Sequence, residues 1–181
     1  MLDFPLPVLG FCAWSGTGKT TLIAKLIPLL KSKGLHIGMV KHAHHGFEID
    51  YPGKDSYILR KAGSEQMVIA SRERIVSIQE TPIHQEEPCL TEALATIQPD
   101  HLDLILVEGF KTEKMPKIEL HRQALNRPYL YPKDPTIIAL AEDSTPHPHT
   151  AEHHIKKLDL NQPEQIARFI RHWLQESVSA T

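Results

Sequence analysis

The sequence predicts an α/β protein with a doubly wound, mostly parallel sheet flanked by helices and one β-hairpin excursion. Short apolar runs typical of buried strands alternate along the chain with segments whose apolar residues recur at helical spacing. A strand over 7–12, a helix over 18–33 and a strand over 36–41 open this series, and such a unit forms a right-handed parallel crossover. At 181 residues, we expect a single domain over 1–181.

The remaining elements follow in order along the chain. Further strands are predicted over 102–107, 118–121, 136–141 and 155–160. Further helices are predicted over 55–62, 86–97 and 163–176, the last as the closing helix. Two short β-rich runs over 66–70 and 74–79 are expected to pair as the hairpin. Pro28 should bend the first helix, and the proline- and histidine-containing segment 143–154 is expected to be a mobile loop.

Composition and charge narrow the class of protein. Apolar residues make up 41% and charged residues 23% of the chain, as in soluble globular proteins. The net charge of −2 gives no indication of a nucleic-acid surface. The two cysteines, Cys12 and Cys89, form no disulfide framework and fit a reducing compartment. Because neither a signal peptide nor a membrane-length apolar run is found, we expect a cytoplasmic protein.

A glycine-rich stretch joins the first predicted strand to the first helix. It reads Ala-Trp-Ser-Gly-Thr-Gly-Lys-Thr-Thr over 13–21. A strand, a turn of this kind, Lys-Thr and a helix together form the phosphate-binding P-loop. The glycines allow backbone N–H groups to surround an anion, and the helix adds the positive end of its dipole. Lys19 would reach the β- and γ-phosphates, and the Thr20 hydroxyl would bind Mg²⁺.

Carboxylates at strand ends are the candidates for completing this site, because ligands of such sheets lie at the carboxyl ends of the strands. Glu108 follows the strand over 102–107 and could hold Mg²⁺ or orient a water. Asp50 and Asp55 lie in the long segment after the second strand. The alternative role for Asp55 is to cap the helix that follows it. Asp103 begins its strand at the opposite edge and is a weaker candidate.

Asp143 and the histidines are further candidates. Asp143 follows a predicted strand, where its carboxylate could accept hydrogen bonds from guanine N1–H and N2–H₂; an ordinary polar turn is the alternative. Imidazole clusters can bind zinc or nickel, but neither cluster here has the spacing of a structured metal site. We therefore interpret the histidines as polar loop residues. They are His42, His44, His45, His147, His149, His153 and His154.

These motifs, in this order, resemble the MobB family of GTP-binding adapters in molybdopterin-guanine dinucleotide biosynthesis. Two motifs are specific, Asp-x-x-Gly-Lys-Asp-Ser over 50–56 and Val-Glu-Gly-Phe-Lys over 107–111. The P-loop, Val-Lys-His over 40–42, Arg-Lys-Ala-Gly over 60–63 and Ile-Ile-Ala-Leu-Ala over 137–141 also match. Ala13, in place of the first P-loop glycine, and the segment 145–154 depart from the family pattern.

The resemblance implies a homodimer that binds GTP and Mg²⁺, hydrolyses GTP weakly and assists the guanylyltransferase MobA, which joins GMP to molybdopterin. Members are similar to the metallochaperone and dethiobiotin-synthetase branch of P-loop proteins. Lys41, His42 and the segment 50–56 would face the γ-phosphate or the phosphate of the pterin. Mg²⁺ would lie at Thr20 with Glu108 or Asp50, the two candidates for a catalytic role. The GTP phosphates would be held by Ser15, Gly16, Thr17, Gly18, Lys19, Thr20 and Thr21.

Two other functions compete with the adapter. A small-molecule kinase would share the P-loop, but such enzymes usually carry an arginine-rich lid. The chain has scattered arginines and no arginine-dense segment, which makes a kinase the less favoured reading. A nickel-delivery GTPase is suggested only by the two histidine clusters.

Overall fold

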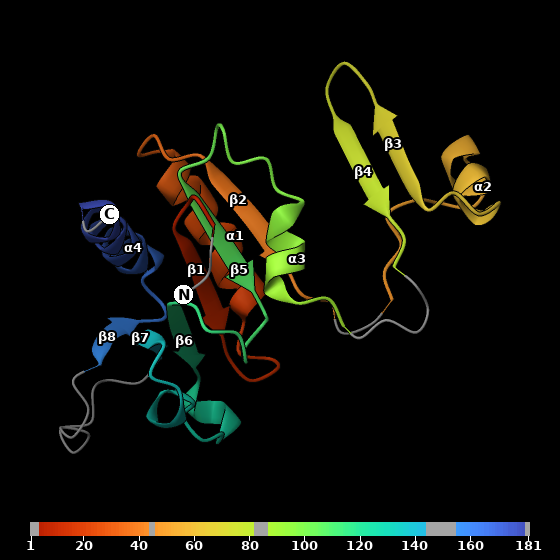
Figure 1. Ribbon diagram of the computed structural model, residues 1–181. Helices are drawn as coiled ribbons and strands as arrows, with labels where there is room; N and C mark the ends of the chain where they lie inside the picture. Colours follow the sequence, from red (N-terminus) through yellow and green to blue (C-terminus); the bar gives the residue numbers. More distant parts are fainter. Residues whose placement is uncertain (1–3, 44–45, 82–86, 144–154, 180–181) are drawn as a thin grey trace. The chain divides into compact units, whose positions relative to one another are not determined.

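The computed structural model describes residues 4–43, 46–81, 87–143 and 155–179 (Figure 1). The chain divides into two compact units, one formed by residues up to 42 together with those from 89 onward, the other by residues 43–88. The two units are described separately below.

A six-stranded sheet forms the centre of the first unit. Its strands run in the order β2-β5-β1-β6-β7-β8, and each neighbouring pair is parallel (Figure 1). The strands are β1 (Val8–Cys12), β2 (Ile37–Lys41), β5 (Leu104–Glu108), β6 (Lys117–His121), β7 (Ile137–Glu142) and β8 (Lys156–Asp159). Because β1 and β5 are neighbouring parallel strands, the segments that follow them leave the same edge of the sheet.

Helices cover both faces of this sheet, which confirms the predicted doubly wound α/β class. Along β5 the side chains alternate between two cores, as the two-residue period of a strand requires. Leu104 and Leu106 pack in the core that contains α1 (Lys19–Lys31) and α4 (Pro163–Ser179). Ile105 and Val107 pack in the other core with α3 (Leu90–Ala95). A strand buried on both faces reads as a continuous apolar run, which is why β5 was recognisable.

The first helix has the predicted position and stop signal. Helix α1 contains Pro28 and ends where the N–H of Gly34 donates to the carbonyl of Lys31 at 2.9 Å. Helix α3 is shorter than the predicted helix over 86–97. The Glu92 carboxylate accepts a hydrogen bond from the Cys89 N–H at 2.8 Å and so sets the start of α3 at residue 90. Most of the expected loop over 143–154 lies outside the described residues.

The second unit contains α2 (Asp55–Lys61) and the antiparallel hairpin of β3 (Gln66–Ala70) and β4 (Ile75–Gln79), as predicted. The prediction that Asp55 caps α2 is wrong. Lys54 is the N-cap, since its carbonyl already accepts the Ile58 N–H at 3.1 Å. Asp55 is therefore the first helical residue, where its charge still favours the positive end of the helix dipole.

Two 3₁₀ turns, η1 (Gln123–Leu125) and η2 (Tyr131–Lys133), lie between β6 and β7. They are anchored by Glu119, a fully buried residue of β6 whose carboxylate accepts the N–H groups of Leu130 and Tyr131, each at 2.8 Å. Burial raises the pKa of Glu119, and these two hydrogen bonds oppose that shift. Within the described part of the chain, every helix is too short or too polar to cross a membrane.

Candidate functional site

The loop between β1 and α1 has the backbone conformation that anion binding needs. Gly16 and Gly18 have φ values of +80° and +96°, in the left-handed region that favours glycine. A Cβ added to Gly16 would meet no atom within 4 Å, so the loop is open on that side. Gly18 is the N-cap of α1, and no side chain caps the helix there. The amides of the first turn therefore have no side-chain cap, as at helix N-termini that bind anions.

Lys19 and Ala13 lie at the two ends of this loop. The Lys19 ammonium donates to the carbonyl of Ala13 at 3.4 Å, a long contact that holds the side chain across the loop. Only Phe110 and Asn126 among the described non-glycine residues have a positive φ. Ala13 thus occupies a conformation that alanine adopts without strain, and its methyl group does not prevent the loop from forming.

A carboxylate from β5 meets the hydroxyl of the first turn of α1. The Thr20 hydroxyl donates to the Glu108 carboxylate at 2.7 Å. The Lys41 ammonium at the end of β2 lies 3.6 Å from the other oxygen of Glu108. The Glu108 side chain is only 12% exposed, so its charge is partly desolvated and directed toward these two partners. A hydroxyl and a carboxylate oxygen are ligands that Mg²⁺ prefers, so the donor set fits that ion.

The turn after β5 is packed tightly against the end of β2. Gly109 has φ +94°, and a Cβ placed there would lie 2.7 Å from the Cβ of His42. The His42 N–H donates to the carbonyl of Glu108 at 2.9 Å. The His42 ring stacks on Phe110 with 4.4 Å between ring centroids. These contacts fix the backbone directly after the Glu108 side chain.

Asp143 lies directly after β7 and holds an arginine. Its carboxylate accepts the Gln123 N–H at 3.0 Å and pairs with the Arg122 guanidinium at 3.2 Å. The same guanidinium donates through Nε to the carbonyl of Thr17 at 2.9 Å. Arg122 therefore joins the loop after β1 to the segment after β7. The sequence analysis did not single it out.

Trp14 is the largest side chain of residues 13–21, the predicted phosphate-binding loop, called the phosphate loop below. Its indole N–H donates to the carbonyl of Pro128 at 2.8 Å. The Lys111 ammonium and the Arg127 guanidinium lie 6.0 and 5.5 Å from the ring centroid, within cation–π range. Trp14 therefore ties the phosphate loop to the segment that precedes η2.

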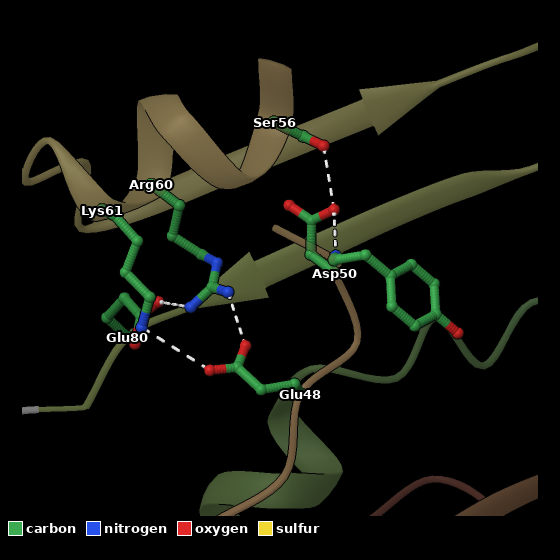
Figure 2. Close-up of polar contacts among 7 residues, drawn as sticks. Glu48, Asp50, Ser56, Arg60, Lys61 and Glu80 are labelled. Carbon is green, nitrogen blue, oxygen red and sulfur yellow. Dashed lines mark hydrogen bonds and ion pairs between the residues drawn. The ribbon is translucent and has the colours of Figure 1, made fainter. Parts of the chain in front are cut away.

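Asp50 and Asp55 belong to the second unit, as Figure 2 shows for Asp50. One oxygen of Asp50 accepts the Tyr51 N–H at 3.0 Å and the Ser56 hydroxyl at 3.1 Å. Its other oxygen is buried and has no hydrogen-bond partner among the described residues. The assignment of Asp50 and Asp55 to the nucleotide site remains a prediction.

A charged cluster beside Asp50 was not predicted (Figure 2). Arg60 of α2, whose side chain is only 8% exposed, bridges the carboxylates of Glu48 and Glu80 at 2.6 and 2.7 Å. The hydrogen bond from Arg60 lowers the pKa of Glu48. The cluster connects the segment before α2 to the residue after β4 and thereby organises the second unit.

The structure brings together at one sheet edge the phosphate loop, Lys41, His42, Glu108 and Asp143, all within the first unit. The histidines at positions 44, 45 and 147–154 lie outside the described residues. Among the residues that are described, no group of three or more His, Cys, Asp or Glu side chains could hold a metal ion.

Residues 8–143 match the model of the family described as MobB, molybdopterin guanine dinucleotide synthesis protein B. The chain belongs to the MobB family. The match spans the phosphate loop, Glu108 and Asp143, so the residues of the candidate site lie inside the part that defines the family.

Relatives and solved structures agree with this family. The chain is 45% identical over 172 residues to a molybdopterin-guanine dinucleotide biosynthesis adapter protein of Escherichia coli strain K12, covering 94% of this chain and 95% of that one. A Haemophilus influenzae protein of the same description is 42% identical over 170 residues, with 93% and 90% covered. A crystal structure of molybdopterin-guanine biosynthesis protein B superposes with a TM-score of 0.71 at 25% identity, covering 93% and 99%. These proteins share the fold along nearly the whole chain.

Proposed function

We propose that this MobB-family chain is a GTP-binding adapter in the formation of molybdopterin guanine dinucleotide. The observation that carries the proposal is the 2.7 Å contact between the Thr20 hydroxyl and the Glu108 carboxylate at the mouth of the phosphate loop. It joins residues 88 positions apart at the place where a P-loop protein holds the Mg²⁺ of its nucleotide. The names of the Escherichia coli and Haemophilus influenzae relatives support the adapter role.

The residues of the site have complementary roles in this proposal. The amides of residues 15–21 and the Lys19 ammonium bind the phosphate oxygens, as positive groups at a helix N-terminus do. Thr20 and Glu108 bind Mg²⁺, which neutralises phosphate charge when bound. The Lys41 ammonium, 3.6 Å from Glu108, adds a positive charge beside that carboxylate and beside the phosphates. His42 positions Glu108 through the hydrogen bond of its backbone N–H.

Guanine recognition is assigned to Asp143. A carboxylate offers about four acceptor positions, and the two contacts to Gln123 and Arg122 use one on each oxygen. With only these two partners counted among the described residues, one further acceptor position on each oxygen is assigned to the N1–H and N2–H₂ donors of guanine. Adenine offers no matching pair of donors, so the site should prefer GTP.

The action of the chain is proposed to depend on a partner enzyme. We infer that the GTP-loaded protein, as a homodimer with at most weak GTPase activity, assists the guanylyltransferase MobA. Asp50 and Asp55 would approach the γ-phosphate or the phosphate of the pterin. The two free thiols, Cys12 and Cys89, support action in the reducing cytoplasm.

Calorimetric titration tests the nucleotide part of the proposal. The wild-type protein is titrated with GTP and ATP, each with and without Mg²⁺, and we expect a Mg²⁺-dependent preference for GTP. Lys19→Ala should abolish binding with the fold intact, because it removes the ammonium at the phosphates. Lys25→Ala, at an exposed position of the same helix, is the matched control and should bind like wild type. Unchanged affinity in K19A would remove the phosphate loop from the site.

Glu108→Gln tests the metal part. The amide keeps the shape of the side chain but removes the charge that binds Mg²⁺, so the Mg²⁺ dependence of GTP affinity should weaken. An unaltered metal requirement would exclude Glu108. A preference for ATP in the wild-type protein would refute the guanine assignment and direct the search toward a phosphoryl acceptor. Co-purification with the guanylyltransferase, compared for wild type and K19A, tests the adapter role.

A further inference from the structure

We infer that Arg122 is a positioning residue that couples the phosphate-binding loop to the base-reading carboxylate of Asp143. The inference rests on the proposed function and adds to it a residue that sets nucleotide specificity. It is carried by one guanidinium with two partners, the carbonyl of Thr17 and the carboxylate of Asp143. These partners belong to segments that follow β1 and β7, which are separated by β6 in the sheet.

The first contact orients an amide of the phosphate loop. The Thr17 carbonyl accepts the Arg122 Nε–H at 2.9 Å. In a trans peptide unit the carbonyl and the N–H point in opposite directions, so fixing the Thr17 carbonyl also fixes the direction of the Gly18 N–H. That N–H belongs to the peptide at the start of α1, where the phosphate is expected. Arg122 thus fixes the direction of the Gly18 N–H, a proposed phosphate-binding donor, through the carbonyl of the same peptide unit.

The packing around Gly18 supports this role. A Cβ built on Gly18 would lie 3.7 Å from Nη2 and 3.9 Å from Nε of Arg122. The guanidinium therefore lies beside the turn at Gly18, where φ is +96°. Thr17 is 2% exposed, and its hydroxyl is tied to the carbonyl of Trp14 at 2.7 Å. Thr17 is therefore fixed by two hydrogen bonds, one from Arg122 to its carbonyl and one from its hydroxyl to Trp14.

The second contact orients the carboxylate. Nη1 of Arg122 donates to one oxygen of Asp143 at 3.2 Å, and the Gln123 N–H donates to the other at 3.0 Å. Two donors on different oxygens fix the plane of the carboxylate. The Asp143 side chain is 20% exposed, so part of the carboxylate faces the surface of the first unit. Loss of Arg122 would free one oxygen and let the carboxylate rotate.

The shape of arginine suits this coupling better than that of lysine. A guanidinium presents donors on separate nitrogens in a rigid plane, so Nε and Nη1 serve two acceptors at once. A lysine ammonium carries the same charge as a point and cannot hold the carbonyl and the carboxylate in the same arrangement. The Arg122 side chain is 38% exposed, so it acts at the surface of the first unit and not as part of its core.

The experiment measures GTP and ATP dissociation constants for wild type, Arg122→Ala, Arg122→Lys and the control Arg168→Ala. Arg168 lies exposed on α4, so its loss removes one positive charge without touching the site. We expect R122A to weaken GTP binding about ten- to hundred-fold, as for loss of charge-assisted hydrogen bonds. ATP should be weakened less, because only the contact to Thr17 serves both nucleotides. The ratio of the two constants should therefore fall toward one, and R122K should not restore it.

Three results would overturn the inference. R122A could bind both nucleotides like R168A, or it could weaken both by the same factor and keep the GTP preference. R122K could restore the full preference, in which case charge alone would suffice. Thermal unfolding midpoints identify any variant that fails to fold, and R122K then carries the test. A wild-type protein without GTP preference would refute the proposed function instead, so the two failures are distinguishable.

Discussion

Replacing Gly109 with alanine should cost more stability than the same change at Gly34. Both glycines have positive φ, +94° and +85°, so each alanine incurs the penalty of the left-handed region, about 1–2 kcal/mol. A Cβ on Gly34 meets no atom within 4 Å, whereas one on Gly109 lies 2.7 Å from the His42 Cβ. Overpacking typically adds about 1–3 kcal/mol. We expect a loss in unfolding free energy of about 2–5 kcal/mol for G109A and about 1–2 kcal/mol for G34A.

Urea unfolding at equilibrium measures both losses, and a double-mutant cycle isolates the clash. His42→Ala keeps the Cβ that alanine at 109 would strike, so it should not relieve G109A. His42→Gly removes that atom. In the double variant, most of the unfolding free energy that G109A loses beyond G34A should therefore be recovered as a coupling energy. Equal destabilisation by G109A and G34A, or equal rescue by both His42 variants, would refute the reasoning. The Mg²⁺ dependence of GTP binding in G109A should also weaken, because the same turn holds Glu108.

Two further predictions concern ionisable groups. Burial raises the pKa of the Cys12 thiol to about 12, whereas Cys89 is exposed. At pH 8 the native protein should therefore react with a thiol reagent only at Cys89. The variant Cys89→Ser should not react until the chain unfolds. The hydrogen bond from Arg60 lowers the pKa of Glu48 in the folded protein. This ion pair therefore stabilises the second unit at pH values above the unfolded pKa of Glu, which is about 4.3. The stabilisation is lost as the pH falls through the lower pKa of the folded state. NMR titration of the Glu48 carboxyl carbon should show the shift, and Arg60→Gln should remove it; an ordinary pKa in wild type would exclude the pair.

The sheet and the hairpin were predictable because their signals are local. Leu104 to Val107 are all apolar and all buried, as expected of a strand covered on both faces. The register of β3 and β4 follows from two short β-rich runs and a turn in which the Ser71 N–H donates to the Arg74 carbonyl. Helix boundaries depend on single hydrogen bonds. The Glu92 contact sets the start of α3, and the bond from the Ile58 N–H to the Lys54 carbonyl makes Lys54, and not Asp55, the N-cap of α2.

The candidate site was predictable where a motif has fixed spacing and not where the fold brings distant residues together. Gly18, Lys19 and Thr20 follow from the pattern of the P-loop, and Glu108 from its place at a strand end. Arg122 stands at the end of β6, the same kind of position, and its contact with Thr17 joins residues 105 positions apart. The strand-end residues predicted to complete the site from the sequence pattern are carboxylates, whereas the signal for Arg122 is a cation directly after a strand.

Trp14 gives the phosphate loop an optical signal of its own. The chain has only one other tryptophan, Trp173, on α4. Indole emission responds to the charges and hydrogen bonds around the ring, and Trp14 has a hydrogen bond to Pro128 and two cations within 6.0 Å. Under the proposed function, a phosphate that binds in the loop would change that electric field. In a Trp173→Phe protein, the intrinsic fluorescence of one residue would therefore follow nucleotide arrival and departure in real time, with unlabelled ligand.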